Sequence, residues 1–278
     1  MTFLWGWIII GISKFDTKGH GPMKIFIMTD LEGISGISRK EQVDNSEPYA
    51  LERLMADVNA AVRGAFDGGA DEVYVEDGHG GGKNFIKDML DPRAVQVGNA
   101  SAGVTDMAKV DAMFLIGAHA MSGTQNAFLD HTQSSMTWHD YYVNGKRCGE
   151  IAQEAIYAGA FGVPVVMVSG DFAACAEARE FFGNIRTAVV KYAERRNEAE
   201  CISEEEAERL IYEAAKAAMG RIGEAKPYRI TLPAEIKIEY NRADFCDDAA
   251  KWSGAERLDA RTLRKITDKI EVYRDILI

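Results

Sequence analysis

Apolar runs alternate with helix-like patterns along residues 24–195. The runs at 24–29, 111–117 and 163–168 are almost continuously apolar, which is typical of strands buried on both faces of a parallel sheet. Between the first run and a further predicted strand at 72–76, apolar residues recur every three or four positions, as on one face of a helix: Leu51, Leu54, Met55, Val58, Val62 and Ala65. This alternation predicts an α/β fold of three layers, in which helices cover both faces of a mostly parallel sheet.

The pattern changes after the last of these elements. Ser203 followed by three glutamates predicts the start of a helix. Residues 228–240 then have the pattern of β structure, and residues 268–278 have the pattern of a final helix. Earlier in the chain, an extended segment at 135–143 ends in Asn144-Gly145, a pair that favours a hairpin turn.

The chain is expected to divide into three parts. An α/β core at 23–195 precedes a smaller C-terminal α+β segment at 196–278, and both follow an N-terminal extension at 1–22. The extension contains a ten-residue apolar run, residues 3–12, which is too short to span a bilayer and lacks the features of a secretory signal. Met23 directly precedes the first strand, so we expect the natural start there and no catalytic role for the extension.

Composition and charge exclude several classes of protein. Apolar residues make up 47% of the 278 positions and charged residues 27%, an ordinary balance for a globular protein. The net charge of −11 repels nucleic acid and anionic membrane surfaces, so neither is an expected partner. The four cysteines are too far apart for a zinc ribbon or a redox motif, and scattered thiols are typical of a reducing compartment, which predicts a cytoplasmic protein.

Polar residues follow three of the predicted strands. The carboxyl ends of parallel strands meet at one edge of a sheet, where functional residues gather. Asp30 and Glu32 follow the first strand, and their spacing places both carboxylates on the same side of an extended chain. Two carboxylates so placed repel each other unless a cation lies between them. His79 follows the second strand in Asp77-Gly78-His79, and His119 follows the strand at 111–117.

Each of these residues has a structural explanation when it is taken alone. Loop carboxylates are commonly solvated, a histidine after a buried strand is commonly hydrogen-bonded within the fold, and Glu150 in the first turn of a predicted helix suits the helix dipole. Together, two imidazoles and three carboxylates form a donor set that suits zinc or another divalent transition metal. Five ligands are more than one catalytic zinc takes, which predicts two metals that share a bridging carboxylate. The predicted ligands are Asp30, Glu32, His79, His119 and Glu150.

His131 is the predicted catalytic residue among the five histidines of the chain. It lies in a polar stretch without an apolar pattern, and a loop histidine beside a metal pair can polarise a carbonyl or move a proton. His139 is expected to be structural or to orient a ligand, and His20 lies in the N-terminal extension.

Five short motifs occur in a fixed order between Met23 and the strand at 163–168. They are Asp30-Leu31-Glu32-Gly33-Ile34-Ser35-Gly36, Asp77-Gly78-His79, Gly117-Ala118-His119-Ala120, Gly149-Glu150 and a strand that ends in Ser169-Gly170-Asp171. In this order they resemble the motifs of the zinc D-aminopeptidases of the dipeptide-transport-protein type, which are self-compartmentalising bacterial enzymes. The resemblance extends from Met23 to near the C-terminus.

The resemblance implies an activity and an assembly. It places two zinc ions per subunit on the five ligands named above and the catalytic role on His131. It implies hydrolysis, by a metal-activated water, of short peptides that begin with a D-amino acid such as D-Ala. It also implies a homodecamer of two stacked five-membered rings whose active sites face an inner chamber.

Two other functions remain open at this point. The same site suits a metal-dependent amidase that acts on a non-peptide substrate, and assays of D-Ala peptides beside simple amides separate the two. A non-catalytic peptide-binding protein is the third reading, although binding alone has no need of two histidines and three carboxylates at strand ends. Zinc-dependent turnover eliminates it.

Overall fold

The structure is a computed structural model that describes residues 21–44, 46–98 and 107–278. The predicted N-terminal extension, including His20, lies outside these residues except for its last two positions.

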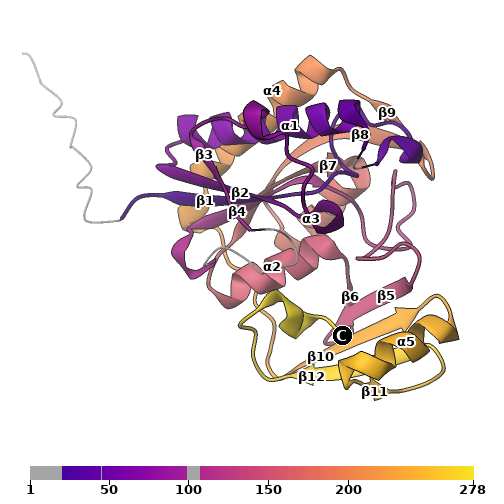
Figure 1. The fold of residues 1–278 in the computed structure, drawn as a ribbon. Helices are drawn as coiled ribbons and strands as arrows, with labels where there is room; N and C mark the ends of the chain where they lie inside the picture. Colours follow the sequence, from indigo (N-terminus) through magenta and orange to yellow (C-terminus); the bar gives the residue numbers. More distant parts are fainter. Residues whose placement is uncertain (1–20, 45, 99–106) are drawn as a thin grey trace, which may run out of the picture.

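A seven-stranded sheet forms the centre of the molecule (Figure 1). Its strand order is β3-β2-β1-β4-β7-β8-β9, and every neighbouring pair is parallel except β8 with β9. The strands are β1 (Lys24–Thr29), β2 (Glu72–Asp77), β3 (Ala94–Gln96), β4 (Ala112–Ala118), β7 (Val165–Asp171), β8 (Arg186–Arg195) and β9 (Glu198–Cys201). The predicted α/β fold with a mostly parallel sheet is therefore confirmed.

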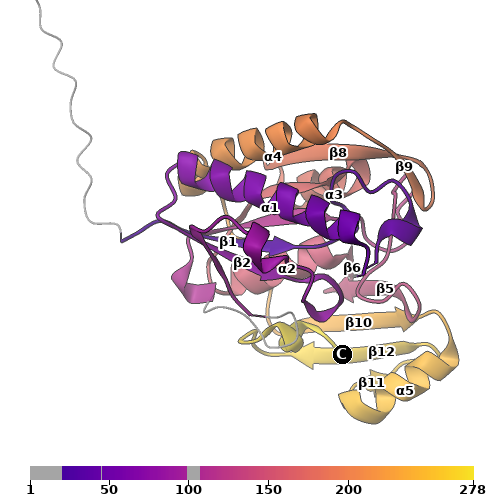
Figure 2. The same ribbon diagram turned by 45° about the horizontal axis from the view of Figure 1, so that its top comes forward.

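Helices cover both faces of this sheet. As Figure 2 shows, α1 (Pro48–Asp67) and α4 (Glu204–Met219) pack together over one face, and α2 (Glu150–Ala160) and α3 (Phe172–Phe182) cover the other. Successive side chains of β1 enter opposite layers, because Ile25 and Ile27 belong to one buried apolar cluster and Phe26 to the other. The three predicted layers are thus present. Within the described ranges, no helix has the length and apolarity that a bilayer-spanning segment needs.

A smaller antiparallel sheet lies beside α2 (Figure 1), with the strand order β11-β12-β10-β5-β6. It consists of β5 (Trp138–Val143), β6 (Lys146–Cys148), β10 (Ala234–Tyr240), β11 (Glu256–Arg257) and β12 (Thr262–Thr267), and α5 (Ala243–Ser253) packs against it. Tyr141 of β5 and Ile236 of β10 belong to the same apolar cluster as Ile156 of α2, which joins the two sheets through one core.

The two sheets do not follow the order of the chain. β9 and α4 lie after residue 195 but pack with the larger sheet, whereas the hairpin of β5 and β6 lies before it and pairs within the smaller one. The division of the chain at residue 196 stays a prediction.

The predicted C-terminal helix at 268–278 is wrong. Only one short turn forms there, η6, because side chains bind carbonyl groups that would accept the hydrogen bonds of a helix: Thr267 donates to Lys269 O (2.8 Å) and Lys265 to Arg274 O (3.2 Å). Tyr141 of β5 also donates to Ile276 O (2.6 Å), which holds the tail against the smaller sheet. The short 3-10 helices are η1 (Lys40–Gln42), η2 (His79–Gly81), η3 (Lys87–Met89), η4 (Met107–Lys109), η5 (Ile222–Glu224) and η6 (Tyr273–Ile276).

The loop after β1 crosses the end of β4 at backbone contact distance. Gly33 N donates a hydrogen bond to Gly117 O (2.8 Å), and a Cβ on Gly33 would lie only 2.0 Å from Ala118 O. Gly117 has a φ of +77°, and a Cβ there would lie 2.2 Å from Asp30 O. These glycines hold the loop that carries Asp30 against the strand end that leads to His119.

Gly33→Ala is expected to lower the free energy of unfolding by about 3 kcal/mol, since the new methyl group overlaps backbone atoms that cannot move aside. Urea unfolding of the metal-free protein measures the change. Gly223→Ala is the matched control, because a Cβ at this exposed position of η5 meets nothing within 4 Å, and it should change the value little. Equal stability of the two variants would show that the loop after β1 does not pack closely against the end of β4.

Candidate metal centre

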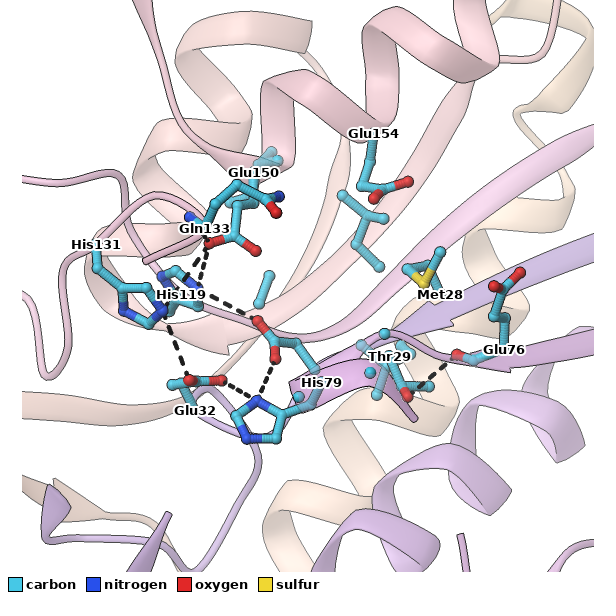
Figure 3. Close-up of a pocket in the computed structure, with 18 of the residues that line it drawn as sticks. Met28, Thr29, Glu32, Glu76, His79, His119, His131, Gln133, Glu150 and Glu154 are labelled. Carbon is cyan, nitrogen blue, oxygen red and sulfur yellow. Dashed lines mark hydrogen bonds and ion pairs between the residues drawn. The ribbon is translucent and has the colours of Figure 1, made fainter. Parts of the chain in front are cut away.

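The predicted ligands converge above the carboxyl end of the larger sheet (Figure 3). They line one cavity of about 430 Å³ together with His131. The six residues come from five parts of the fold. Asp30 and Glu32 follow β1, His79 opens η2 after β2, His119 follows β4, Glu150 opens α2, and His131 lies in the loop between β4 and β5.

Asp30 lies at the centre of the cluster, between two imidazoles. Its Oδ1 is 3.0 Å from His79 Nδ1 and its Oδ2 is 3.3 Å from His119 Nε2. His79 Nδ1 also lies 2.9 Å from Glu32 Oε2, and His119 Nε2 lies 3.2 Å from Glu150 Oε1. Asp30 is therefore common to two groups of three side chains whose possible ligand atoms lie within 4.8 Å of one another. A carboxylate that bridges two cations needs this position.

The hydrogen bonding of the cluster fits a bound cation. His119 Nδ1 lies 3.0 Å from Ala120 O, and since a carbonyl only accepts, a proton lies on Nδ1; Nε2, which faces Asp30 and Glu150, is therefore the nitrogen that would bind a metal. Glu32 Oε2 and His119 Nε2 are buried and make no well-aligned hydrogen bond, although polar atoms lie near them. Buried polar atoms without such a partner are costly, and a cation supplies one. Imidazole with carboxylate suits zinc.

The two carboxylates after β1 ionise unequally. Burial raises the pKa of Glu32 to about 7, and the neighbouring charge of Asp30 adds to the effect. Burial also acts against ionisation of Asp30, but the hydrogen bond from His79 and the charge of His119 outweigh it and hold its pKa below the usual range. Burial likewise disfavours the His79 imidazolium, yet its hydrogen bond to Asp30 and the nearby carboxylate of Glu32 raise its pKa to about 11. A metal that binds here displaces protons from these groups.

His131 has a different environment from the other two histidines. Its ring stacks on that of His119 with centroids 4.1 Å apart, and its Nε2 lies 3.7 Å from Glu32 Oε1 and 4.0 Å from Glu150 Oε1. Burial and, to a smaller extent, the charge of His119 lower the pKa of His131 to about 4. The imidazole is therefore neutral near pH 7 and can accept a proton. Glu32, His119 and His131 also form a third possible ligand group.

Buried side chains position the ligands. Lys191 is fully buried, and its Nζ donates to Glu32 O (2.9 Å) and to Ile37 O (2.7 Å), which ties down the loop after β1. Gln133 N donates to Glu150 Oε1 (2.7 Å) and orients that carboxylate toward the cluster. These bonds keep the donor atoms in place before any ligand binds.

Among the other residues that line the cavity are four polar side chains that were not singled out in the sequence: Glu76, Gln133, Glu154 and Tyr273. Glu154 lies one helical turn after Glu150, and Glu76 directly precedes Asp77-Gly78-His79. Their spacing from these predicted ligands could therefore have identified both glutamates. No sequence pattern pointed to Tyr273, because it reaches the cavity from the C-terminal tail. His139 lies on β5, outside the cavity lining, with about half of its side chain exposed.

Comparisons with known proteins identify the family of this chain. Residues 23–277 match the model of the peptidase M55 family, which is described as D-aminopeptidase. A D-aminopeptidase of Bacillus subtilis (strain 168) is 29% identical over 265 residues, which cover 92% of this chain and 96% of the relative.

A solved structure agrees as well. The Zn-dependent D-aminopeptidase DppA from Bacillus subtilis, described as a self-compartmentalizing protease, superimposes with a TM-score of 0.85 at 26% identity, over 92% of this chain and 96% of that one. The resemblance to zinc D-aminopeptidases is thus confirmed, and a non-catalytic binding protein is set aside. Because the match covers nearly the whole chain, this chain belongs to the peptidase M55 family and is a metallo-aminopeptidase.

Proposed function

We propose that this enzyme hydrolyses short peptides whose first residue is a D-amino acid such as D-alanine. The observation that carries the proposal is the position of Asp30, which joins two carboxylate–imidazole groups in one cavity. The preference for a D-residue is supported by the family description and the names of the relatives. Glu32, His119 and the other ligands do not by themselves encode handedness.

Two zinc ions per subunit are proposed for the cluster. One would be held by Asp30, Glu32 and His79, and the other by Asp30, His119 and Glu150. Zinc bound at these residues supplies the positive charge that activates a water and polarises the scissile carbonyl.

The protein's own side chains bind the peptide and move its protons. His131 is neutral near pH 7 and faces the cluster, so its Nε2 is placed to take a proton from the attacking water and to return it to the leaving amine. Leu115 and Ile151 form an apolar part of the cavity beside the cluster, which excludes water from the bound peptide and accepts its side chain.

The proposed assembly is a homodecamer of two five-membered rings in the cytoplasm. The description of the related solved structure as a self-compartmentalizing protease supports a closed assembly. The four cysteines are unpaired, as expected in a reducing compartment.

Light scattering is expected to give a mass about ten times that of the 30.6 kDa subunit, and a monomer in solution would contradict the assembly.

Removal of the metal is expected to abolish hydrolysis of D-Ala-D-Ala, and zinc is expected to restore it. The purified enzyme should contain about two zinc ions per subunit by mass spectrometry. L-Ala-L-Ala and simple alanine amides are the comparison substrates. Faster turnover of the simple amides would favour the non-peptide amidase, and activity that survives chelation would contradict the metal site.

Ligand variants test the same site directly. His79→Ala should retain about one zinc ion per subunit instead of two, since it removes a ligand from only one of the two groups. His139→Ala is the matched control, because His139 lies outside the cavity, and it should keep both the metal content and the activity.

His131→Ala is expected to lower kcat by about a hundredfold or more while zinc content stays at the wild-type value. The reason is that the variant loses a proton-transfer group but none of the five proposed ligands. Steady-state kinetics with D-Ala-D-Ala and metal analysis measure the two effects. Full activity would remove His131 from the mechanism, and loss of zinc would instead make it a ligand.

A further inference from the structure

The cavity continues beyond the metal ligands to a second acidic end. In Figure 3, Glu76 and Glu154 lie on the side of Met28 and Thr29, apart from the cluster around His119. Tyr273 and the apolar side chains of Leu115 and Ile151 also line the cavity. None of the proposed catalytic steps uses either carboxylate.

Glu76 is a buried carboxylate, and one of its oxygens has no hydrogen-bond partner among the described residues. It pairs in register with Met28 of β1, and this places its side chain on the α2 face of the sheet. Only 1% of the residue is exposed, and its Oε2 has no hydrogen-bond partner among the described residues. An acceptor that is buried and unpaired is costly to the fold, so such a group in a binding cavity points to a ligand that supplies the donor.

Glu154 approaches the same space from the helix. It lies one turn beyond Glu150, about 6 Å further along α2. Burial raises the pKa of Glu154 to about 8, against the hydrogen bond from Tyr273, and the charges of Glu76 and Glu150 add to the rise. Burial raises the pKa of Glu76 to about 7. No lysine or arginine is among the described residues that line the cavity, so the two carboxylates face it without a cation.

We propose that Glu76 and Glu154 bind an ammonium group of the substrate. This inference rests on the proposed function and names a substrate group for it. An ammonium has three donors, which two carboxylates and the Tyr273 hydroxyl can share. A metal ion fits less well, because neither glutamate belongs to a described group of three close ligand residues.

Two positions of a peptide substrate can supply this ammonium group. The α-ammonium of the first residue lies two bonds from the scissile carbonyl carbon, within reach of a carboxylate one helical turn from Glu150. The side-chain ammonium of a lysine-like first residue reaches further into the same cavity. Either source neutralises the acidic end when the substrate binds.

Kinetics of Glu76→Gln and Glu154→Gln separate the two sources. Glutamine keeps the shape of the side chain but removes its charge. The substrates are D-Ala-p-nitroanilide, which has only the α-ammonium, and D-Lys-p-nitroanilide, which has both groups. Loss of a charge-assisted hydrogen bond is expected to raise KM about tenfold or more with little change in kcat. A rise for both substrates identifies the α-ammonium, and a rise for D-Lys-p-nitroanilide alone identifies the side chain.

The control variant is Glu180→Gln, which makes the same change at an exposed position of α3 outside the cavity. Its kinetics should equal those of the wild type. Zinc content and melting temperature of all variants establish that the metal centre and the fold are intact. If Glu154→Gln is unstable, Glu76→Gln decides, because it lies on a strand and not on the helix that carries Glu150.

Calorimetry supplies a readout that does not depend on turnover. The zinc-loaded wild-type protein is titrated with butylammonium and, separately, with the neutral butyramide. Binding of butylammonium that both glutamine variants lose supports the inference, even if hydrolysis of D-peptides fails and the proposed function falls. Unchanged KM for both substrates together with unchanged butylammonium binding would overturn it. So would variants that lose zinc or kcat while KM stays constant, since the glutamates would then serve the metal centre.

Discussion

The pairing of β1 between β2 and β4 is the constraint on which the site depends. Thr29 lies in register with Asp77 on one side and with Ile116 on the other, so the next residue, Asp30, emerges between the two strand ends that lead to the histidines. The contact of Gly33 with Gly117 then holds the loop against β4. Because the backbone fixes both sides, a single carboxylate can reach two imidazoles without any movement.

Buried polar groups crowd together in the cavity. Carboxylates and imidazoles lie side by side there, and buried polar atoms of Glu32, Glu76 and His119 have no well-aligned hydrogen-bond partner among the described residues. Elsewhere the two apolar clusters and the paired strands are conventional and stabilise the molecule. Such a distribution is typical of a binding site, where ligands supply the missing partners, and it supports the proposed cations at one end of this cavity and the proposed ammonium group at the other.

Sequence patterns predicted the architecture well where elements are long and buried. The continuous apolar runs of β1, β4 and β7 predicted a parallel sheet correctly, since only strands covered on both faces lack polar positions. They failed at residues 268–278, where helical spacing was present but the backbone of the tail binds Tyr141 and Lys265 of the smaller sheet. A local pattern does not report hydrogen bonds to distant side chains.

The sequence by itself determined which residues have the chemistry of a metal site, because ligand type and position at a strand end are local properties. The five predicted ligands and His131 follow from these local properties, and the structure brings all six to one cavity. Only the tertiary structure decided that Asp30 is shared between two groups and that Glu76, Glu154 and Tyr273 line the same cavity. These residues come from a strand, a helix and the C-terminal tail, and contacts between such distant segments arise only when the layers pack.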